Sequence, residues 1–384
     1  MKTDISVLTE FDPTLFSCKE APLVSLYMPT HRHAPENQQD PIRYKNLMTE
    51  VENLLELNYD RKQYEGIMAA LRSIEEHRDS GIWRNAKDGL AILASNEKAS
   101  IYKLDYPVDE FVSVTDSYHI KPLIRNFQFG SHYYLIALSA DDFALYEGDF
   151  HTIEKLEMPE GVETRFSEVF DDFDNTLLGL GGTHGSHAPS YHRYGDKSEV
   201  IEKETIKHFR YASKIIEEHF ASKHRCPFIL VSLPEHQNAF REVSSIPTLL
   251  DESIEKPFYS MDEKEVLEEA TSIIESIQKA RIAERTDRLG SEISQGRAST
   301  DPREVAHALA ERKVETLFIE RGELVPGTFD PETGSLSYGA DALDASDDLT
   351  DDFAQAAYLQ GGDVYVLDAD RMPSDTGVAA LFRY

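Results

Sequence analysis

The residues with the most chemical potential lie in one stretch, GGTHGSHAPSYHRYG, at residues 181–195. It holds four glycines, three histidines, two tyrosines and one arginine, and no acidic residue, in a chain of formal charge −31. Neutral imidazole can bind zinc or act as a general base. Glycines let a backbone approach a ligand closely, and tyrosines can stack on nucleic-acid bases. The stretch is therefore a candidate for metal binding, for hydrolysis or for contact with RNA.

The spacing of the three histidines argues against metal binding and against hydrolysis, but not against contact with RNA. His184, His187 and His192 are the candidate metal ligands, but their His-x2-His-x4-His spacing lies on a loop and matches no motif with a known mechanism. No nucleophile is clearly paired with any of these histidines, which argues against hydrolysis with histidine as the general base. We therefore expect no metal and no cofactor, and we keep a histidine-dependent hydrolase as the alternative function.

Local charge favours contact with RNA. From residue 181 to 214 the sequence has six basic and four acidic residues, a net charge of +2 within a strongly acidic chain. Local basicity beside tyrosines suits phosphate contact and base stacking. The competing interpretation is a solvated loop followed by an ordinary charged helix face. The candidate RNA-binding residues are His184, Gly185, His187, Tyr191, His192, Arg193, Tyr194 and Lys197.

A second loop, THRHAPENQQDP at residues 30–41, also carries histidines. It follows the end of an expected strand, which is a common place for binding residues in α/β domains. It could contact RNA, including mRNA, or it could be a plain polar connection. The candidate residues are His31, Arg32 and His33 in the loop, with Arg43 and Lys45 on the following helix.

Alternating strand-like and helix-like segments must position both loops. Apolar runs predict strands at 23–29, 88–95, 99–105 and 227–234, and a hairpin from 133–139 and 143–149. Periodic apolar residues predict helices at 41–57, with Asp40 as its cap, and at about 197–222. Ser260–Glu263 has the spacing of a capping box, and Asp301 is expected to cap a helix that starts at Pro302.

We expect three domains, at residues 1–125, 126–256 and 257–384, the second carrying the loop at 181–195. Two cysteines, Cys18 and Cys226, are too few for a disulfide framework. The sequence shows no signal peptide and no apolar run of membrane-spanning length, so the expected location is the cytoplasm. The charge of −31 argues against general nucleic-acid binding but leaves room for one basic surface.

The order of segments resembles the bacterial branch of the archaeo-eukaryotic peptide-chain release factor family, which includes Pelota-like rescue factors. The resemblance rests on VSLYMP and DGLAILAS, on the YYLIALSADDFALYEGD hairpin with the glycine-rich loop and long helix after it, and on the ending GVAALFRY. It implies a release-factor-like N-terminal domain, a ribonuclease-H-like middle domain and a C-terminal α/β/α domain like that of kink-turn RNA-binding proteins. It also implies a ribosomal partner, contact with rRNA or tRNA, and a translational GTPase.

The chain departs from this family at two motifs. Release factors carry Gly-Gly-Gln after a His-Gly pair, whereas here His184 and Gly185 are followed by SHAPS, and no glutamine lies between 181 and 201. The family's glutamine helps to place the attacking water, so its absence argues against peptide release. The Asn-Ile-Lys-Ser motif is also missing. The resemblance thus favours a ribosome-associated factor, in rescue or hibernation, over a hydrolase of peptidyl-tRNA or a plain protein-interaction module.

Overall fold

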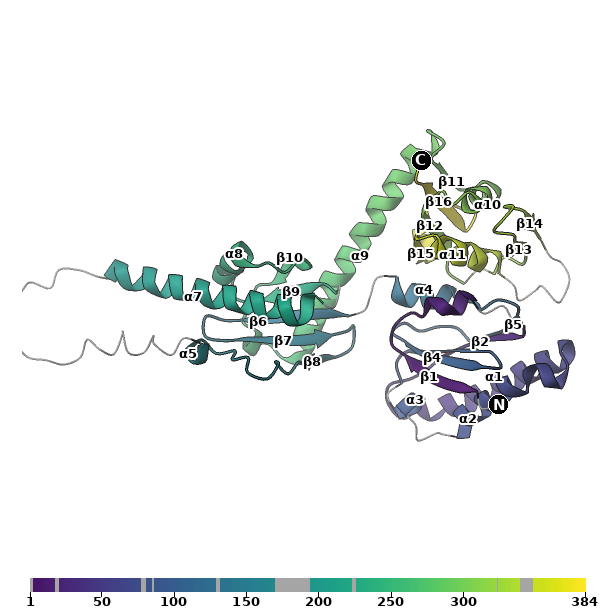
Figure 1. The fold of residues 1–384 in the computed structure, drawn as a ribbon, viewed down its shortest axis with the longest axis horizontal. Helices are drawn as coiled ribbons and strands as arrows, with labels where there is room; N and C mark the ends of the chain where they lie inside the picture. Colours follow the sequence, from purple (N-terminus) through teal and green to yellow (C-terminus); the bar gives the residue numbers. More distant parts are fainter. Residues whose placement is uncertain are drawn as a thin grey trace, which may run out of the picture. The chain divides into compact units, whose positions relative to one another are not determined.

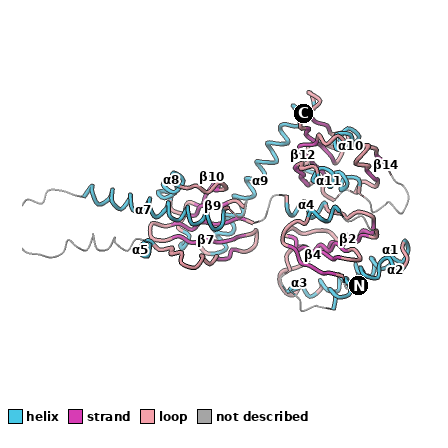
Figure 2. The backbone as a smooth tube through the Cα atoms, viewed as in Figure 1, coloured by secondary structure: helices cyan, strands magenta, loops and turns pink. Residues whose placement is uncertain are grey.

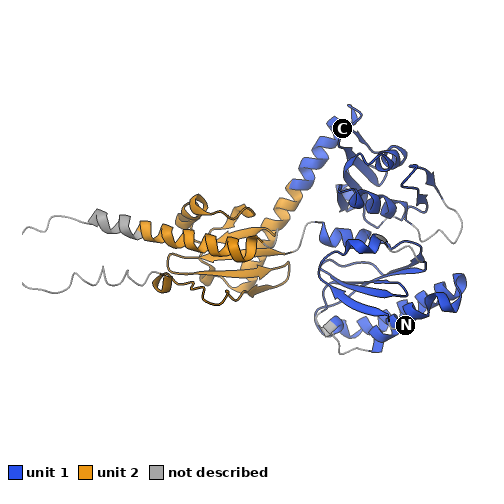
Figure 3. Cartoon of the chain, in the orientation of Figure 1, with its two compact units in different colours: residues 1–129, 281–384 blue, residues 130–280 orange. Residues whose placement is uncertain are grey.

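The structure is a computed structural model that describes residues 3–17, 21–76, 81–84, 86–128, 132–169, 194–222, 226–322, 324–338 and 348–384. The chain forms two compact units (Figure 3). Unit 1 combines Met1–Phe129 with Arg281–Tyr384, and unit 2 is Gly130–Ala280. The three-domain division expected from the sequence stays a prediction.

The N-terminal part of unit 1 is built on a mixed sheet with the strand order β1-β4-β3-β2-β5 (Figure 1). The strands predicted at 23–29, 88–95 and 99–105 are confirmed as β2, β3 and β4. Strand β3 pairs antiparallel with both β2 and β4. Helices α1, α2 and α3 cover one face with a shared apolar core. The bounds are β1 Asp4–Leu8, β2 Leu23–Pro29, α1 Asp40–Asn58, α2 Arg61–Glu76, α3 Gly81–Arg84, β3 Gly89–Ala94, β4 Lys98–Leu104, β5 Phe111–Thr115 and α4 Lys121–Phe127.

Unit 2 is built on a sheet with the order β10-β9-β6-β7-β8. Strands β6, β7 and β8 form an antiparallel meander, and β9 and β10 continue the sheet parallel to β6. This is the ribonuclease-H-like strand order, as expected. The bounds are β6 Tyr133–Leu138, β7 Phe143–Gly148, β8 Ile153–Lys155, α5 Phe166–Val169, α7 Tyr194–Ile216 with a π-helical turn at Glu217–Ala221, β9 Phe228–Val231, α8 Pro234–Val243 and β10 Leu249–Ile254.

Helices cover both faces of the unit 2 sheet (Figure 2). Phe209 and Ile216 of α7 and Phe240 of α8 are buried against one face. Val266 and Ala270, at the start of α9 (Glu263–Ile293), are buried against the other. The predicted apolar strand is the interior strand β9, whose four residues are all buried.

The C-terminal part of unit 1 has the sheet order β11-β16-β12-β15. Helices α10 and α11 pack on one face, and Ile282 and Leu289 of α9 pack on the other, which gives the expected α/β/α layers. A two-stranded ribbon, β13-β14, lies in the connection before α11. The bounds are β11 Ala298–Ser299, α10 Pro302–Ala310, β12 Val314–Glu320, β13 Thr328–Phe329, β14 Leu336–Ser337, α11 Leu349–Leu359, β15 Asp363–Leu367 and β16 Val378–Phe382.

One apolar core joins the two ends of the chain within unit 1. Tyr27 and Leu93, on the sheet face that α1 and α2 leave open, share a cluster with Leu309 and Phe353 of α10 and α11. Gln128, after α4, adds a polar contact to edge strand β15: it accepts from the Val366 amide at 2.7 Å and donates to the Val366 carbonyl at 3.3 Å. The N- and C-terminal parts therefore fold as one body.

Four buried ionisable side chains fasten the same junction. The Lys121 Nζ lies 2.6 Å from the Asp348 carboxylate. Asp351 Oδ1 accepts from the backbone amides of Ile120 at 2.8 Å and Lys121 at 2.6 Å, and lies 3.4 Å from His119 Nδ1. Asp351, on α11, thus supplies the acceptor that the start of α4 needs, since the first amides of a helix have no partner within it.

Two of the three predicted caps are wrong. Asp40 lies inside α1 and makes no cap bond there, because its carboxylate accepts from His31 instead. Ser260 donates to the Pro257 carbonyl, and Asp262 caps α9 by accepting from the Glu265 amide at 2.8 Å. Asp301 caps α10 as predicted, accepting from Arg303 at 2.8 Å.

Candidate functional site

The leading sequence candidates fall outside the described residues. His184, Gly185, His187, Tyr191, His192 and Arg193 belong to the undescribed range 170–193. Tyr194 begins α7 and Lys197 lies in its first turns, but their side chains are not described. Within the described residues, no group of three or more metal-ligating side chains comes together. Contact of these residues with RNA stays a prediction, and so does the question of metal at the three histidines.

The described chain before this loop is held against α7. The ring Nε2 of His208, on α7, lies 3.1 Å from the Thr164 carbonyl oxygen. The His208 ring also packs on Phe143, at 5.8 Å between centroids, and edge-on against Phe166 at 5.7 Å. The Phe166 amide donates to the Asp141 carbonyl at 2.7 Å. His208 therefore fixes the chain that enters the loop to the helix that leaves it.

Burial lowers the pKa of His208, and its hydrogen bond to the Thr164 carbonyl opposes that effect only in part. A histidine whose pKa is lower in the folded state stabilises the fold above its unfolded pKa of about 6.5 and loses that stability as the pH falls. We expect wild type to lose more stability between pH 7.5 and 5.5 than His208→Phe, by up to about 1.4 kcal/mol, since the range extends one unit below the unfolded pKa. Urea unfolding at both pH values measures this, and parallel losses in the two proteins would contradict it.

Helix α7 carries a basic stripe on its exposed face. Lys203, Lys207, Arg210 and Lys214 are exposed and follow one another at steps of four, three and four residues. At 3.6 residues per turn these steps place them on one side, away from the buried stripe that includes Phe209. Lys207 pairs with Glu204 at 2.6 Å and Lys214 with Glu218 at 3.8 Å. Exposed pairs of this kind are worth little and leave the cations available to a phosphate.

Two carboxylates, Asp40 and Asp88, hold the second loop in place. Buried Asp40 accepts from the His31 amide and from its Nδ1, both at 2.8 Å. Arg32 binds Asp88 through Nε at 2.9 Å.

Beside this loop, Arg43 binds Glu110 through Nε at 2.7 Å and has its second guanidinium nitrogen 3.9 Å from Asp40. The structure therefore brings His31 and Arg43 to one carboxylate, while His33 and Lys45 are exposed. RNA contact by this loop stays a prediction.

The strand order of unit 2 agrees with the ribonuclease-H-like middle domain that the sequence resemblance implies. Residues 132–313 match the family model described as bacterial archaeo-eukaryotic release factor family 3. The resemblance seen in the sequence is therefore confirmed, and this chain is related to the bacterial archaeo-eukaryotic release factors. No curated protein matches the chain.

Similar solved structures include an archaeal translation termination factor, aRF1, which is 13% identical, with 96% of this chain and 95% of that chain covered and a TM-score of 0.25. Pelota of Archaeoglobus fulgidus is 16% identical, with coverage of 77% and 79% and a TM-score of 0.29. Dom34 of S. cerevisiae, a translation termination-like factor that interacts with Hbs1, is 10% identical, with coverage of 80% and 78% and a TM-score of 0.40.

Proposed function

We propose that this protein is a ribosome-associated translation factor that binds stalled or idle ribosomes, in rescue or hibernation, without releasing the peptide. The family match over residues 132–313 supports a role in translation. The observation that carries the proposal is the exposed basic stripe of α7, in a protein of charge −31. In this proposal the stripe and the loop at 181–195 contact rRNA or the acceptor end of tRNA.

The basic stripe provides a local positive surface in a protein whose overall negative charge disfavours RNA binding. A strongly acidic protein repels phosphate at long range, so it needs a local cationic surface for contact. Lys203, Lys207, Arg210 and Lys214 supply such a surface on the helix that follows the loop at 181–195. We further propose a cytoplasmic location and a translational GTPase as a partner. Among the described helices, none has the length and apolar character needed to cross a membrane.

Sedimentation with purified 70S ribosomes tests the proposal. We expect the full-length protein to travel with ribosomes, empty or stalled, at low salt and to leave them as salt rises, because phosphate contacts release counterions. Comparing the two preparations shows which ribosomal state is preferred. Absence of the protein from ribosomal fractions at both low and moderate salt would contradict the proposal.

A peptidyl-tRNA release assay on the same complexes separates binding from hydrolysis. We expect no release above background, because the loop lacks the glutamine that the family uses. Release that is lost in His184→Ala, His187→Ala or His192→Ala would instead establish the histidine-dependent hydrolase. Elemental analysis of the purified protein checks the metal-dependent form of that activity.

A further inference from the structure

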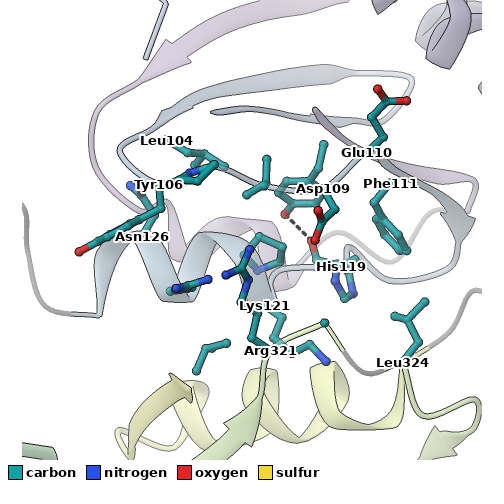
Figure 4. Close-up of a pocket in the computed structure, with 17 residues that line it drawn as sticks. Leu104, Tyr106, Asp109, Glu110, Phe111, His119, Lys121, Asn126, Arg321 and Leu324 are labelled. Atoms are coloured by element: carbon teal, nitrogen blue, oxygen red, sulfur yellow. Dashed lines mark hydrogen bonds between the residues drawn. The ribbon is translucent and has the colours of Figure 1, made fainter. Parts of the chain in front are cut away.

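Unit 1 contains a cavity of about 250 Å³ at the junction of its N- and C-terminal parts (Figure 4). Its wall comes from the segment between β4 and β5, from α4, and from the loop after β12 with Val366 of β15. These segments belong to one compact unit with one apolar core, so the cavity is a feature of a folded body. It lies outside unit 2, which contains the loop and the basic stripe of the proposed function.

Two arginines in the cavity wall share one carboxylate. Arg125 lies 3.2 Å from one oxygen of Asp368, and Arg321 lies 3.2 Å from the other. Each contact occupies one nitrogen of a guanidinium that has five N–H donors. One carboxylate cannot neutralise two guanidinium groups, so the pair has one positive charge in excess. The side chains are 20% and 35% exposed, so this charge is partly withdrawn from water.

The arginines are held in place rather than free to turn away. The Arg125 guanidinium lies over the Tyr106 ring, 5.6 Å from its centroid. Burial and the neighbouring Arg321 both lower the pKa of Arg125, the effect expected where a second cation lies close and water is scarce. An incoming anion would relieve this repulsion. Bidentate contact of arginine with a carboxylate or phosphate is also among the stronger polar interactions in proteins.

The other charged side chains of the wall are either paired with other groups or exposed to solvent. Lys121 is occupied by Asp348 at 2.6 Å and by the Thr350 hydroxyl at 2.8 Å. Glu110 is held by Arg43 at 2.7 Å, and Asp109 is exposed to solvent. Among the described charged groups of the wall, Arg125 and Arg321 are therefore the ones suited to receive an anion.

The apolar side chains of the wall can accommodate a planar, apolar ring of a ligand. It includes Tyr27, Leu104, Val108, Phe111, Pro122 and Leu324. An apolar protein cavity of about 150 Å³ accommodates benzene. A volume of about 250 Å³ therefore accommodates a single or fused ring with a short substituent. Aromatic and proline side chains provide the flat surfaces on which such a ring packs.

We propose that this cavity binds a small organic anion with a planar ring, the ring lying among the apolar side chains and the anionic group on Arg125 and Arg321. Mononucleotides and aromatic carboxylates share this chemistry. The site is a binding site beyond the proposed ribosome contact, and its occupancy requires no ribosome.

Isothermal titration of the full-length protein tests the site with defined probes. AMP and indole-3-acetate combine a ring with a phosphate or a carboxylate, adenosine and indole supply the ring alone, and inorganic phosphate and acetate supply the anion alone. We expect at least one ring-bearing anion to bind at least tenfold more tightly than its separate halves. The better of the two identifies phosphate or carboxylate as the natural group.

Substitution of the arginines shows where the probe binds. Arg321→Gln and Arg125→Gln should each weaken binding at least tenfold, because each removes one of the two cations that face the anion. Arg303→Gln, an exposed arginine on α10 outside the cavity wall, removes the same charge and should leave binding unchanged. Circular dichroism and thermal unfolding establish that each variant is folded, and the more exposed Arg321 provides the variant least dependent on packing.

Two results would overturn the proposal. One is that neither ring-bearing anion binds at millimolar concentration. The other is that binding is equally strong in wild type and in a folded Arg321→Gln variant. Both results are independent of sedimentation with ribosomes, so failure of this site and failure of the proposed function are distinguishable.

Discussion

Changing Lys203, Lys207 and Lys214 together to glutamine is expected to weaken binding to 70S ribosomes about ten- to a hundredfold at low salt. The three exposed lysines belong to the basic stripe of α7, and glutamine keeps helix propensity while removing the charge. If each lysine contacts one phosphate, the slope of log affinity against log salt should also become shallower by about three. Sedimentation or filter binding over a series of salt concentrations measures both quantities.

A second triple variant of unit 2 controls for total charge. Lys155, Lys264 and Lys279 are exposed lysines of the same unit but lie outside α7. Changing them to glutamine alters the net charge by the same amount and should change affinity much less. Equal losses in the two triple variants would show that overall charge, and not the stripe, governs binding.

Replacing Asp351 with alanine is expected to lower the free energy of unfolding of unit 1 by about 3–5 kcal/mol. Asp351 is buried, accepts from two backbone amides at the start of α4 and accepts from Gln355 Nε2 at 3.0 Å. The alanine variant leaves these buried donors without their acceptor and His119 without its neighbouring carboxylate. Guanidinium unfolding monitored by circular dichroism measures the loss.

Asp351→Asn is the matched control, because its amide oxygen can still accept from the backbone donors of Ile120 and Lys121. We expect it to lose about 1–2 kcal/mol, which reflects the missing charge and an imperfect replacement of hydrogen bonds. A loss below about 1 kcal/mol in the alanine variant would show that Asp351 does not fasten the two parts of unit 1.

Local pattern was enough to predict much of the fold. The hairpin β6-β7, the buried strand β9 and the long helix α7 each show a period or an apolar run within a single segment. The ribonuclease-H-like order came from the resemblance, and the strand pairing in unit 2 bears it out. Elements predicted from such strong local patterns form in the structure because tertiary contacts favour the same elements.

The junction within unit 1 was not predictable in this way. Ile120 and Asp351 are 231 residues apart, and no periodicity within either segment points to the other. The prediction that Asp40 caps α1 was wrong for a related reason. A carboxylate near the start of a helix has several possible hydrogen-bond donors, and here the Asp40 carboxylate binds His31. Arg125 and Arg321 likewise meet only through the fold, so the cavity had no sequence signal.

The shared core of unit 1 has a consequence for how the protein is synthesised. The N-terminal sheet is complete at residue 115 and α4 follows it directly, but α10 and α11, whose apolar residues share one cluster with its second face, are made more than 180 residues later. At about 5–20 residues per second, a ribosome needs roughly 10–50 s to reach them. For that time the nascent chain presents an apolar face, formed by the sheet and α4, without its C-terminal cover. A chaperone that shields this face during translation would therefore raise the yield of folded protein, whereas truncation at the C-terminus would leave the face permanently exposed.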